Sequence, residues 1–73
     1  MLIEFTLIEK RRIAINPKDV LSVEQGDYLA RYNNNYEFDG CPTKILIRNH
    51  GTYTVRESFD TVITLLNSEV KYA

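Results

Sequence analysis

Apolar and polar residues alternate at the start of the chain. Residues 2–8 read LIEFTLI, in which positions 3, 5 and 7 are apolar and the positions between them are polar. A period of two is typical of a strand with one buried face. Residues 11–15, RRIAI, continue the alternation, and the Glu9–Lys10 pair between the two segments favours a two-residue turn. We therefore expect an N-terminal β-hairpin.

The strand pattern is broken at residues 16–19, Asn-Pro-Lys-Asp. Pro17 has no N–H to donate to a β-ladder, and the Asn and Asp beside it favour a single tight helical turn. Extended structure is predicted again over residues 20–32, with a bulge or bend at Gly26. Residues 33–42 contain three asparagines, an Asp-Gly pair and a proline, so we expect an irregular surface loop there.

The C-terminal part of the chain predicts a second hairpin and a helix. Residues 43–49, TKILIRN, alternate clearly, and the His-Gly pair that follows suits a turn in which Gly51 adopts a positive φ before a return strand. Ser58 is a suitable N-cap. Beyond it, apolar residues recur at the spacing of one helix face: Phe59, Val62, Ile63 and Leu66. We expect this stripe to cover one face of a sheet and residues 68–73 to form a frayed C-terminal tail.

These elements predict one α+β domain over residues 1–73. It would consist of a small antiparallel sheet of four to five strands with one C-terminal amphipathic helix packed on one face. Such a layer leaves the opposite face and an edge strand uncovered. Leu2 and Ile8 also add apolar residues to the second face of the first strand. We therefore expect a homo-oligomer in which the subunits cover each other's exposed surface.

The charge and the cysteine content narrow the class of protein. Nine basic and ten acidic residues give a net charge of −1. A nucleic-acid-binding protein of this length usually has a basic excess, because neutralisation of phosphates supplies much of its affinity. Nucleic acid is therefore disfavoured as a partner. The single cysteine cannot form an internal disulfide, and no apolar run is long enough for membrane insertion. We expect a cytoplasmic protein.

No cluster of residues in the sequence points to a reaction. His50 is expected at an exposed turn, and Cys41 lies in a loop. The sequence fixes no acid, base or nucleophile beside either of them, as general acid–base or nucleophilic catalysis would require. One cysteine and one histidine also do not supply the paired ligands of a zinc site. We therefore expect no catalytic residues, no metal and no cofactor, and predict that the protein is not an enzyme.

One aromatic segment is a candidate binding surface. Residues 28–38, YLARYNNNYEF, surround an arginine with aromatic residues, a combination that can stack bases and bind phosphates. If the segment were a strand, its tyrosines and its arginine would lie on opposite faces. The tyrosines could be ordinary strand residues, could contact another subunit or a protein partner, or could bind a nucleotide or a single strand. The candidate ligand-binding residues are Tyr28, Arg31, Tyr32, Tyr36 and Arg48.

Two segments, IAINPKDVLSVE (residues 13–24) and TKILIRNHGTYTVRESFDTVITLL (residues 43–66), carry a recognisable order of turns and strands. In this order the chain resembles the FlbD family of small flagellar and swarming-motility proteins, together with short phage and prophage proteins that share the pattern. The matching positions are Asn16, Pro17, Val20, Val23, Glu24, Thr43, Ile45, Gly51, Tyr53, Val55, Glu57, Ser58 and Val62.

The resemblance implies a non-enzymatic accessory protein with no established catalytic residues. Where the flagellar proteins have a short connection, this chain has a longer segment rich in tyrosine and asparagine, residues 25–41. The insertion favours a relative from a phage, a prophage or a mobile element, acting by docking onto an unknown protein partner. The alternatives are a phage-type protein that sequesters a small anionic, nucleotide-like ligand between subunits, a flagellar accessory protein, and a weak binder of single-stranded nucleic acid.

Overall fold

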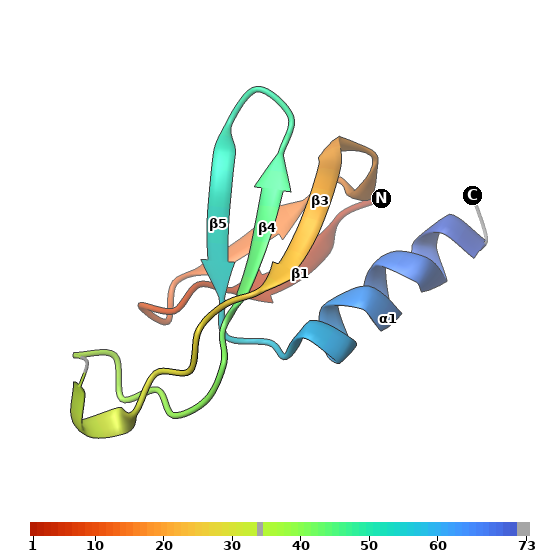
Figure 1. Cartoon of the computed structure of the whole chain (residues 1–73). Coiled ribbons are helices and arrows are strands. Elements are labelled where there is room, and N and C mark those ends of the chain that lie inside the picture. The colour runs from red at the N-terminus through yellow and green to blue at the C-terminus, as the bar shows by residue number, and fades with distance from the viewer. Residues whose placement is uncertain (34, 72–73) are drawn as a thin grey trace.

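The computed structural model describes residues 1–33 and 35–71 and combines short strands with one C-terminal helix (Figure 1). The elements, in chain order, are β1 (Ile3–Thr6), β2 (Arg12–Ile15), η1 (Pro17–Asp19), β3 (Val20–Gln25), η2 (Arg31–Asn33), β4 (Thr43–Ile47), β5 (Gly51–Val55) and α1 (Phe59–Lys71). The two η elements are single turns of 3-10 helix. The predicted α+β class, with antiparallel strands and a C-terminal helix packed against them, is confirmed.

The strands form two antiparallel sheets rather than one. The first is the β1–β2 hairpin, and the second has the strand order β3-β4-β5. A single bridge between Leu7 and Val55 joins them. Two hydrogen bonds flank this bridge. The N–H of Ile8 donates to the carbonyl oxygen of Thr54 at 3.0 Å, and the N–H of Arg56 donates to the carbonyl oxygen of Thr6 at 2.7 Å. The end of β5 is therefore fixed to the chain that follows β1.

The first hairpin has a longer turn than the two-residue turn predicted for Glu9 and Lys10. The N–H of Leu7 donates to the carbonyl oxygen of Arg11 at 2.7 Å, and the N–H of Lys10 donates to that of Leu7 at 2.8 Å. Ile8 is therefore part of the turn as well. Lys10 adopts a left-handed φ of 78°, as the last residue of a three-residue hairpin loop commonly does.

The inner faces of the two sheets and the helix enclose one core. Strand β4 alternates strictly, with Thr43, Ile45 and Ile47 buried and the residues between them exposed. Val62 and Leu66 complete the core from α1, which packs against β3 and η1 (Figure 1). The buried apolar side chains that form the core are Ile3, Phe5, Leu7, Ile15, Ile45, Ile47, Val55, Val62 and Leu66.

The predicted helix signals are confirmed. The side chain of Asn16 accepts a hydrogen bond of 3.0 Å from the N–H of Lys18, which caps η1 at the expected position. Ser58 Oγ accepts one of 3.2 Å from the N–H of Thr61, as an N-cap does. Helix α1 extends to Lys71 and so includes residues 68–71 of the segment expected to fray. Residues 72 and 73 of that segment lie outside the described residues.

The β4–β5 turn contains the glycine conformation that the sequence predicts. Gly51 has a φ of 117°, a value that side chains with a Cβ rarely adopt. The turn itself comprises residues 48–50 rather than His50 and Gly51, because β5 begins at the glycine. The left-handed φ of 60° at Asn49 completes the reversal of the chain.

The predicted extended segment over residues 20–32 is wrong beyond Gln25, where β3 ends. Residues 26–42 instead form an arm that projects from one end of the sheet (Figure 1). At its base the N–H of Gly26 donates to the carbonyl oxygen of Pro42 at 2.7 Å. Farther out, Leu29 and Gly40 exchange two hydrogen bonds, and η2 follows. Residue 34, within the predicted loop 33–42, lies outside the described residues.

Candidate functional site

Four of the five predicted binding residues lie on the arm. Tyr28, Arg31, Tyr32 and Tyr36 all belong to it, whereas Arg48 follows β4 at the opposite end of the sheet. The rise of about 3.3 Å per residue along β4 separates its two ends by roughly 15 Å. The N–H of Arg48 donates to the carbonyl oxygen of Asp19, the last residue of η1, at 2.8 Å. The structure therefore brings together the tyrosines and Arg31, but not Arg48.

The tyrosines of the arm are exposed rather than half-buried strand residues. The exposed fraction is 89% for Tyr32, 62% for Tyr28 and 41% for Tyr36. The separation of tyrosines and arginine onto opposite strand faces does not arise, because Arg31 and Tyr32 both lie in the 3-10 turn η2. Ala30 is buried while Tyr28 and Tyr32 are exposed. The arm thus buries its small apolar residue and presents its aromatic rings to solvent.

Tyr28 and Asp39 connect the outgoing and returning segments of the arm. The hydroxyl of Tyr28 donates a short hydrogen bond to the carboxylate of Asp39. This hydrogen bond raises the pKa of Tyr28 above its usual 10.0, because losing the proton would break it. The bond fixes the orientation of the Tyr28 ring without burying it.

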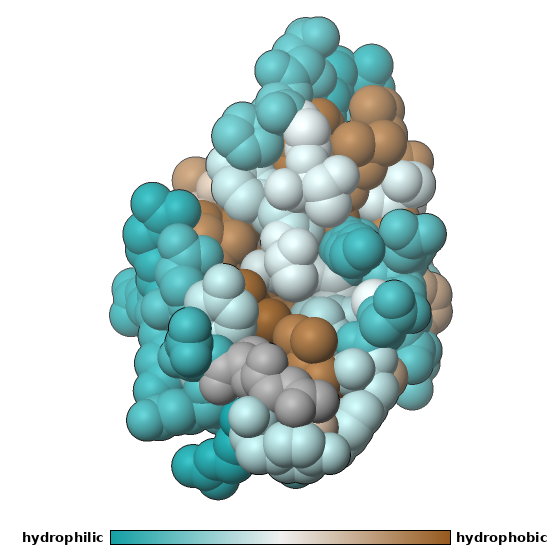
Figure 2. Space-filling view, turned by 60° about the vertical axis from the view of Figure 1, so that its left-hand side comes forward, coloured by the Kyte–Doolittle hydropathy of each residue, from teal (hydrophilic) through white to brown (hydrophobic). Residues whose placement is uncertain are grey.

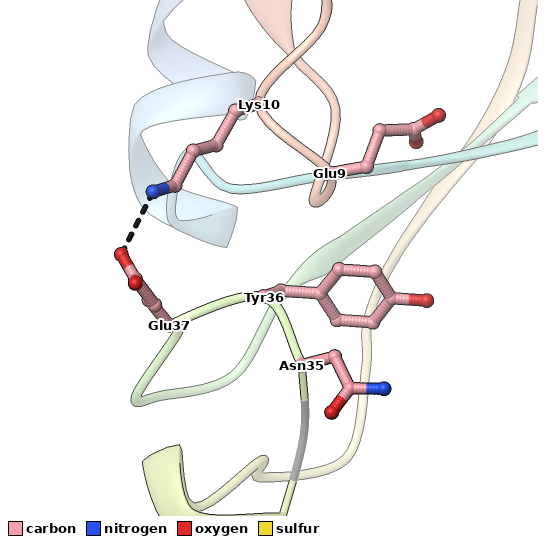
Figure 3. Close-up of a pocket in the computed structure, with 5 residues that line it drawn as sticks. All are labelled: Glu9, Lys10, Asn35, Tyr36 and Glu37. Carbon is pink, nitrogen blue, oxygen red and sulfur yellow. Dashed lines mark hydrogen bonds and ion pairs between the residues drawn. The ribbon is translucent and has the colours of Figure 1, made fainter.

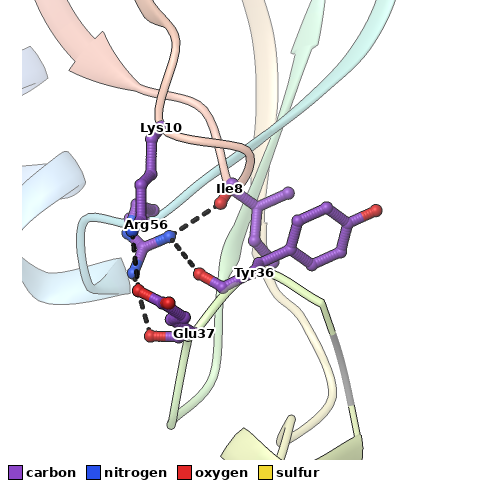
Figure 4. A network of polar contacts seen from close by, with 5 residues as sticks. All are labelled: Ile8, Lys10, Tyr36, Glu37 and Arg56. Carbon is purple, nitrogen blue, oxygen red and sulfur yellow. Dashed lines mark hydrogen bonds and ion pairs between the residues drawn. The ribbon is translucent and has the colours of Figure 1, made fainter.

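Arg56 attaches the arm to the rest of the molecule (Figure 4). Its Nη1 donates to the carbonyl oxygens of Ile8 at 2.7 Å and Tyr36 at 3.1 Å, and its Nη2 donates to that of Glu37 at 3.3 Å. The guanidinium carbon lies 5.0 Å from the centroid of the Phe38 ring, within the range of a cation–π contact. One side chain at the end of β5 thus binds both the β1–β2 turn and the arm.

Sequence reasoning missed Arg56, although the hairpin itself contained a signal. Antiparallel pairing of β4 with β5 places Val55 opposite Thr43. The residue after β5 must then lie beside the residue before β4, which is the last residue of the arm. Arg48, at the turn of the same hairpin, must lie at the far end.

A second contact between the arm and the β1–β2 turn is an ion pair. Lys10 Nζ lies 2.9 Å from Glu37 Oε2, and both side chains are more than half exposed. The hydrogen bond from Lys10, together with its charge, lowers the pKa of Glu37 below its usual 4.5. Glu37 also has a left-handed φ of 54°, which turns the arm toward Lys10 at this point.

An open hollow of about 270 Å³ lies between the arm and the β1–β2 turn (Figure 3). The ring of Tyr36 points away from the Lys10–Glu37 ion pair, toward the side on which Glu9 lies. The charged lining of the hollow comprises two carboxylates and one ammonium group. Glu37 pairs with Lys10, and Glu9 pairs with Arg11 at 3.3 Å. Because carboxylates outnumber ammonium groups in the lining, it suits a cationic or amide group better than an anion. The lining residues are Glu9, Lys10, Asn35, Tyr36 and Glu37.

The remaining candidates for chemistry lie away from the hollow. His50 stacks on Tyr53, with ring centroids 4.4 Å apart and planes 23° from parallel. Cys41 is partly exposed near the base of the arm. Within residues 1–33 and 35–71, no group of three or more histidines, cysteines or carboxylates is placed to hold a metal ion.

On the face shown in Figure 2, hydrophobic atoms form small separate patches framed by hydrophilic ones. No helix in the described part of the chain is long and apolar enough to cross a membrane.

Comparisons of the chain with protein-family models, with curated proteins and with solved structures found no match. The interpretation of the arm therefore depends on its own geometry.

Proposed function

We propose that the protein is a non-catalytic binding protein that docks onto a protein partner through the arm. The observation that carries this proposal is the exposure of Tyr28, Tyr32 and Tyr36 on one projecting segment. Tyrosine is enriched at protein–protein interfaces, because its ring gives a large contact area and its hydroxyl can still bind a polar group.

The attachment of the arm supports the same proposal. A segment that must become ordered on binding loses part of its interaction energy to that ordering. Here Arg56 and the Lys10–Glu37 ion pair already fix the arm against the β1–β2 turn. Exposed aromatic side chains on a fixed backbone are suited to recognition, since few degrees of freedom are lost when the partner binds.

The alternative of a small anionic ligand has weaker support. A nucleotide-like ligand needs cationic groups that remain available to its phosphates. Arg56 donates to three carbonyl oxygens, Lys10 pairs with Glu37, and Arg48 lies at the other end of the sheet. Of the predicted cations, Arg31 in η2 is the one that lies on the arm beside the tyrosines. The hollow beside Tyr36 instead favours a basic or amide side chain of a partner protein, held against the face of the ring.

The biological setting of this docking is part of the proposal. The FlbD-like pattern and the inserted arm favour an accessory protein of phage, prophage or mobile-element origin that acts in the cytoplasm. A flagellar accessory role is the alternative. The genes beside the one that encodes this chain distinguish the two, since motor genes would favour the flagellar role and phage genes the other.

The test compares capture of a host protein by the wild-type chain and by two variants. Tyr32→Ala removes the most exposed ring of the arm, and Thr64→Ala is a matched control on the exposed face of α1. A central tyrosine of an interface typically contributes at least about 2 kcal/mol, or roughly thirtyfold in affinity. We expect Tyr32→Ala to lose the captured protein and Thr64→Ala to retain it. Equal capture by both variants would refute docking through the arm.

A further inference from the structure

The outer face of the β3–β4–β5 sheet points away from the core and away from α1. On β4 its residues are Lys44 and Leu46, which alternate with the buried side chains of that strand. The pairing register places Ser22 and Thr52 on either side of Leu46, and Glu24 and Thr54 on either side of Lys44. The face is thus divided into an uncharged half and a charged half.

The uncharged half presents two leucines to solvent. Leu46 is 37% exposed and Leu21 is 50% exposed. The ladder between β3 and β4 shifts register between Val20 and Ser22, and Leu21 is the extra residue of this bulge. The two leucines therefore lie on neighbouring strands at the same level of the sheet.

The charged half presents one acidic and one basic residue that are not paired within the subunit. Glu24 and Lys44 are register partners on adjacent strands, and both are exposed. Among the described residues, the ion pairs are formed by other side chains, and neither Glu24 nor Lys44 takes part in one. Opposite charges side by side, next to an apolar area, make a surface that is complementary to itself.

We infer that this face binds a second copy of the chain, sheet against sheet, about a two-fold axis that runs along the strands between β3 and β4. Rotation about this axis places β3 of one copy over β4 of the other. Leu46 would then meet Ser22 of the partner subunit and the adjoining Leu21 of the partner subunit, and Glu24 would meet the partner's Lys44, each contact occurring twice. Two sheets packed in this way lie about 10 Å apart, a distance that leucine side chains fill.

The size of the face sets the expected strength. Three strands spaced about 4.8 Å apart and about 17 Å long give a footprint far below the roughly 800 Å² per partner of a typical stable complex. The dimer is therefore weak and forms in a concentration-dependent way. It does not depend on the arm, which leaves the sheet at its end, so the two proposals can fail independently.

Charge reversal tests the inference by sedimentation velocity at protein concentrations up to about 1 mM, a range that reveals weak dimers. Glu24→Lys places two lysines opposite each other at each contact, and Lys44→Glu places two glutamates there. We expect each variant alone to dimerise at least about tenfold more weakly than the wild type. An equimolar mixture of the two variants restores both opposite-charge contacts, so we expect it to form a heterodimer of wild-type strength.

Circular dichroism establishes that both charge variants are folded. Recovery of dimerisation in the mixture is a second check, because unfolded chains would not form the heterodimer. Thr64→Ala on the exposed face of α1 serves as the matched control and should dimerise like the wild type. A wild-type chain that stays monomeric over the whole range overturns the inference. The inference is also overturned if the charge variants dimerise as strongly as the wild type. It is likewise overturned if the mixture dimerises as weakly as either variant alone.

Discussion

Arg56, the residue that follows β5, donates a hydrogen bond of 3.1 Å from its Nη1 to the carbonyl oxygen of Tyr36 on the arm. The same nitrogen donates to the carbonyl oxygen of Ile8 in the β1–β2 turn at 2.7 Å. Two segments that are far apart in sequence are thus connected through one guanidinium group. Because backbone oxygens accept these bonds, they do not depend on which side chains Ile8 and Tyr36 carry.

Replacing Arg56 with alanine should release the arm while leaving the core intact. The change removes hydrogen bonds to three carbonyl oxygens and the contact with the Phe38 ring, and we expect it to cost about 1–3 kcal/mol of unfolding free energy. Hydrogen exchange should accelerate at Leu29 and Gly40 of the arm and stay slow in β4. Arg56→Lys is the matched control, and a single ammonium group should restore only part of the protection. Unchanged exchange in the arm of the alanine variant would contradict this role.

The ion pair between Lys10 and Glu37 should make the attachment of the arm sensitive to acid. The pKa of Glu37 is lowered, first by the hydrogen bond from Lys10 and then by its charge. A carboxylate with a lowered pKa stabilises the folded state above its unfolded pKa, and this contribution is lost as the pH falls through the folded value. The loss is therefore expected below the usual value of 4.5.

An NMR titration of the Glu37 carboxyl carbon measures this shift directly. Lys10→Gln removes the charge while keeping a polar side chain, and should move the pKa of Glu37 back toward 4.5. High salt should move it in the same direction in the wild type, because an exposed ion pair is screened. A Glu37 titration that is the same in both proteins would show that Lys10 is not the cause.

Glu57 should be required for stability through its acceptor oxygens rather than its charge alone. Its carboxylate accepts the N–H of Thr6 at 2.9 and 3.1 Å, which satisfies a backbone donor where β1 meets the start of α1. Glu57→Ala leaves this donor without its partner, and we expect a loss of about 1–3 kcal/mol in chemical denaturation. Glu57→Gln keeps an acceptor oxygen and should lose clearly less. Equal losses in the two variants would contradict the hydrogen-bond explanation.

Gly51 should not tolerate an L-residue. Its φ of 117° strains any residue with an L-configured Cβ, although no atom lies within 4 Å of the place that a Cβ would occupy. Gly51→Ala should therefore lower stability by about 1–2 kcal/mol through backbone strain alone. A synthetic chain with D-alanine at this position is the matched control and should be at least as stable as the wild type. A thermal melt of the L-alanine variant that matches the wild type would refute the argument.

Much of the fold could be predicted because its signals are local. The alternation around Phe5 and Ile45, the N-cap at Ser58 and the positive φ at Gly51 each depend on a few neighbouring residues. The turn at Lys10 could not be predicted in the same way, because a lysine in a left-handed conformation leaves no mark in the sequence. The division into two sheets also depends on the pairing of residues that are far apart along the chain.

The contacts that fix the arm could not be predicted from the sequence, because they too join residues that are far apart along the chain. The sequence singles out the tyrosines of residues 28–38 as candidates but does not predict that they are exposed, and it does not single out the arginine that fixes the arm. Arg48 and Arg56 are the same type of residue at the two ends of β5, and only the direction of that strand decides which of them returns to the arm. The acceptors of Arg56 are backbone oxygens, which every residue carries, so side-chain patterns cannot reveal them.

Site-specific photo-cross-linking in the host cell measures whether a protein partner docks on the arm. A photoreactive phenylalanine derivative would replace Tyr32 on the arm in one chain and Thr64 on α1 in another, two positions that are both exposed. We expect a cross-link to one particular host protein from position 32 and none to that protein from position 64. Cross-links to the same proteins from both positions, or to a specific protein from position 64 alone, would contradict docking on the arm.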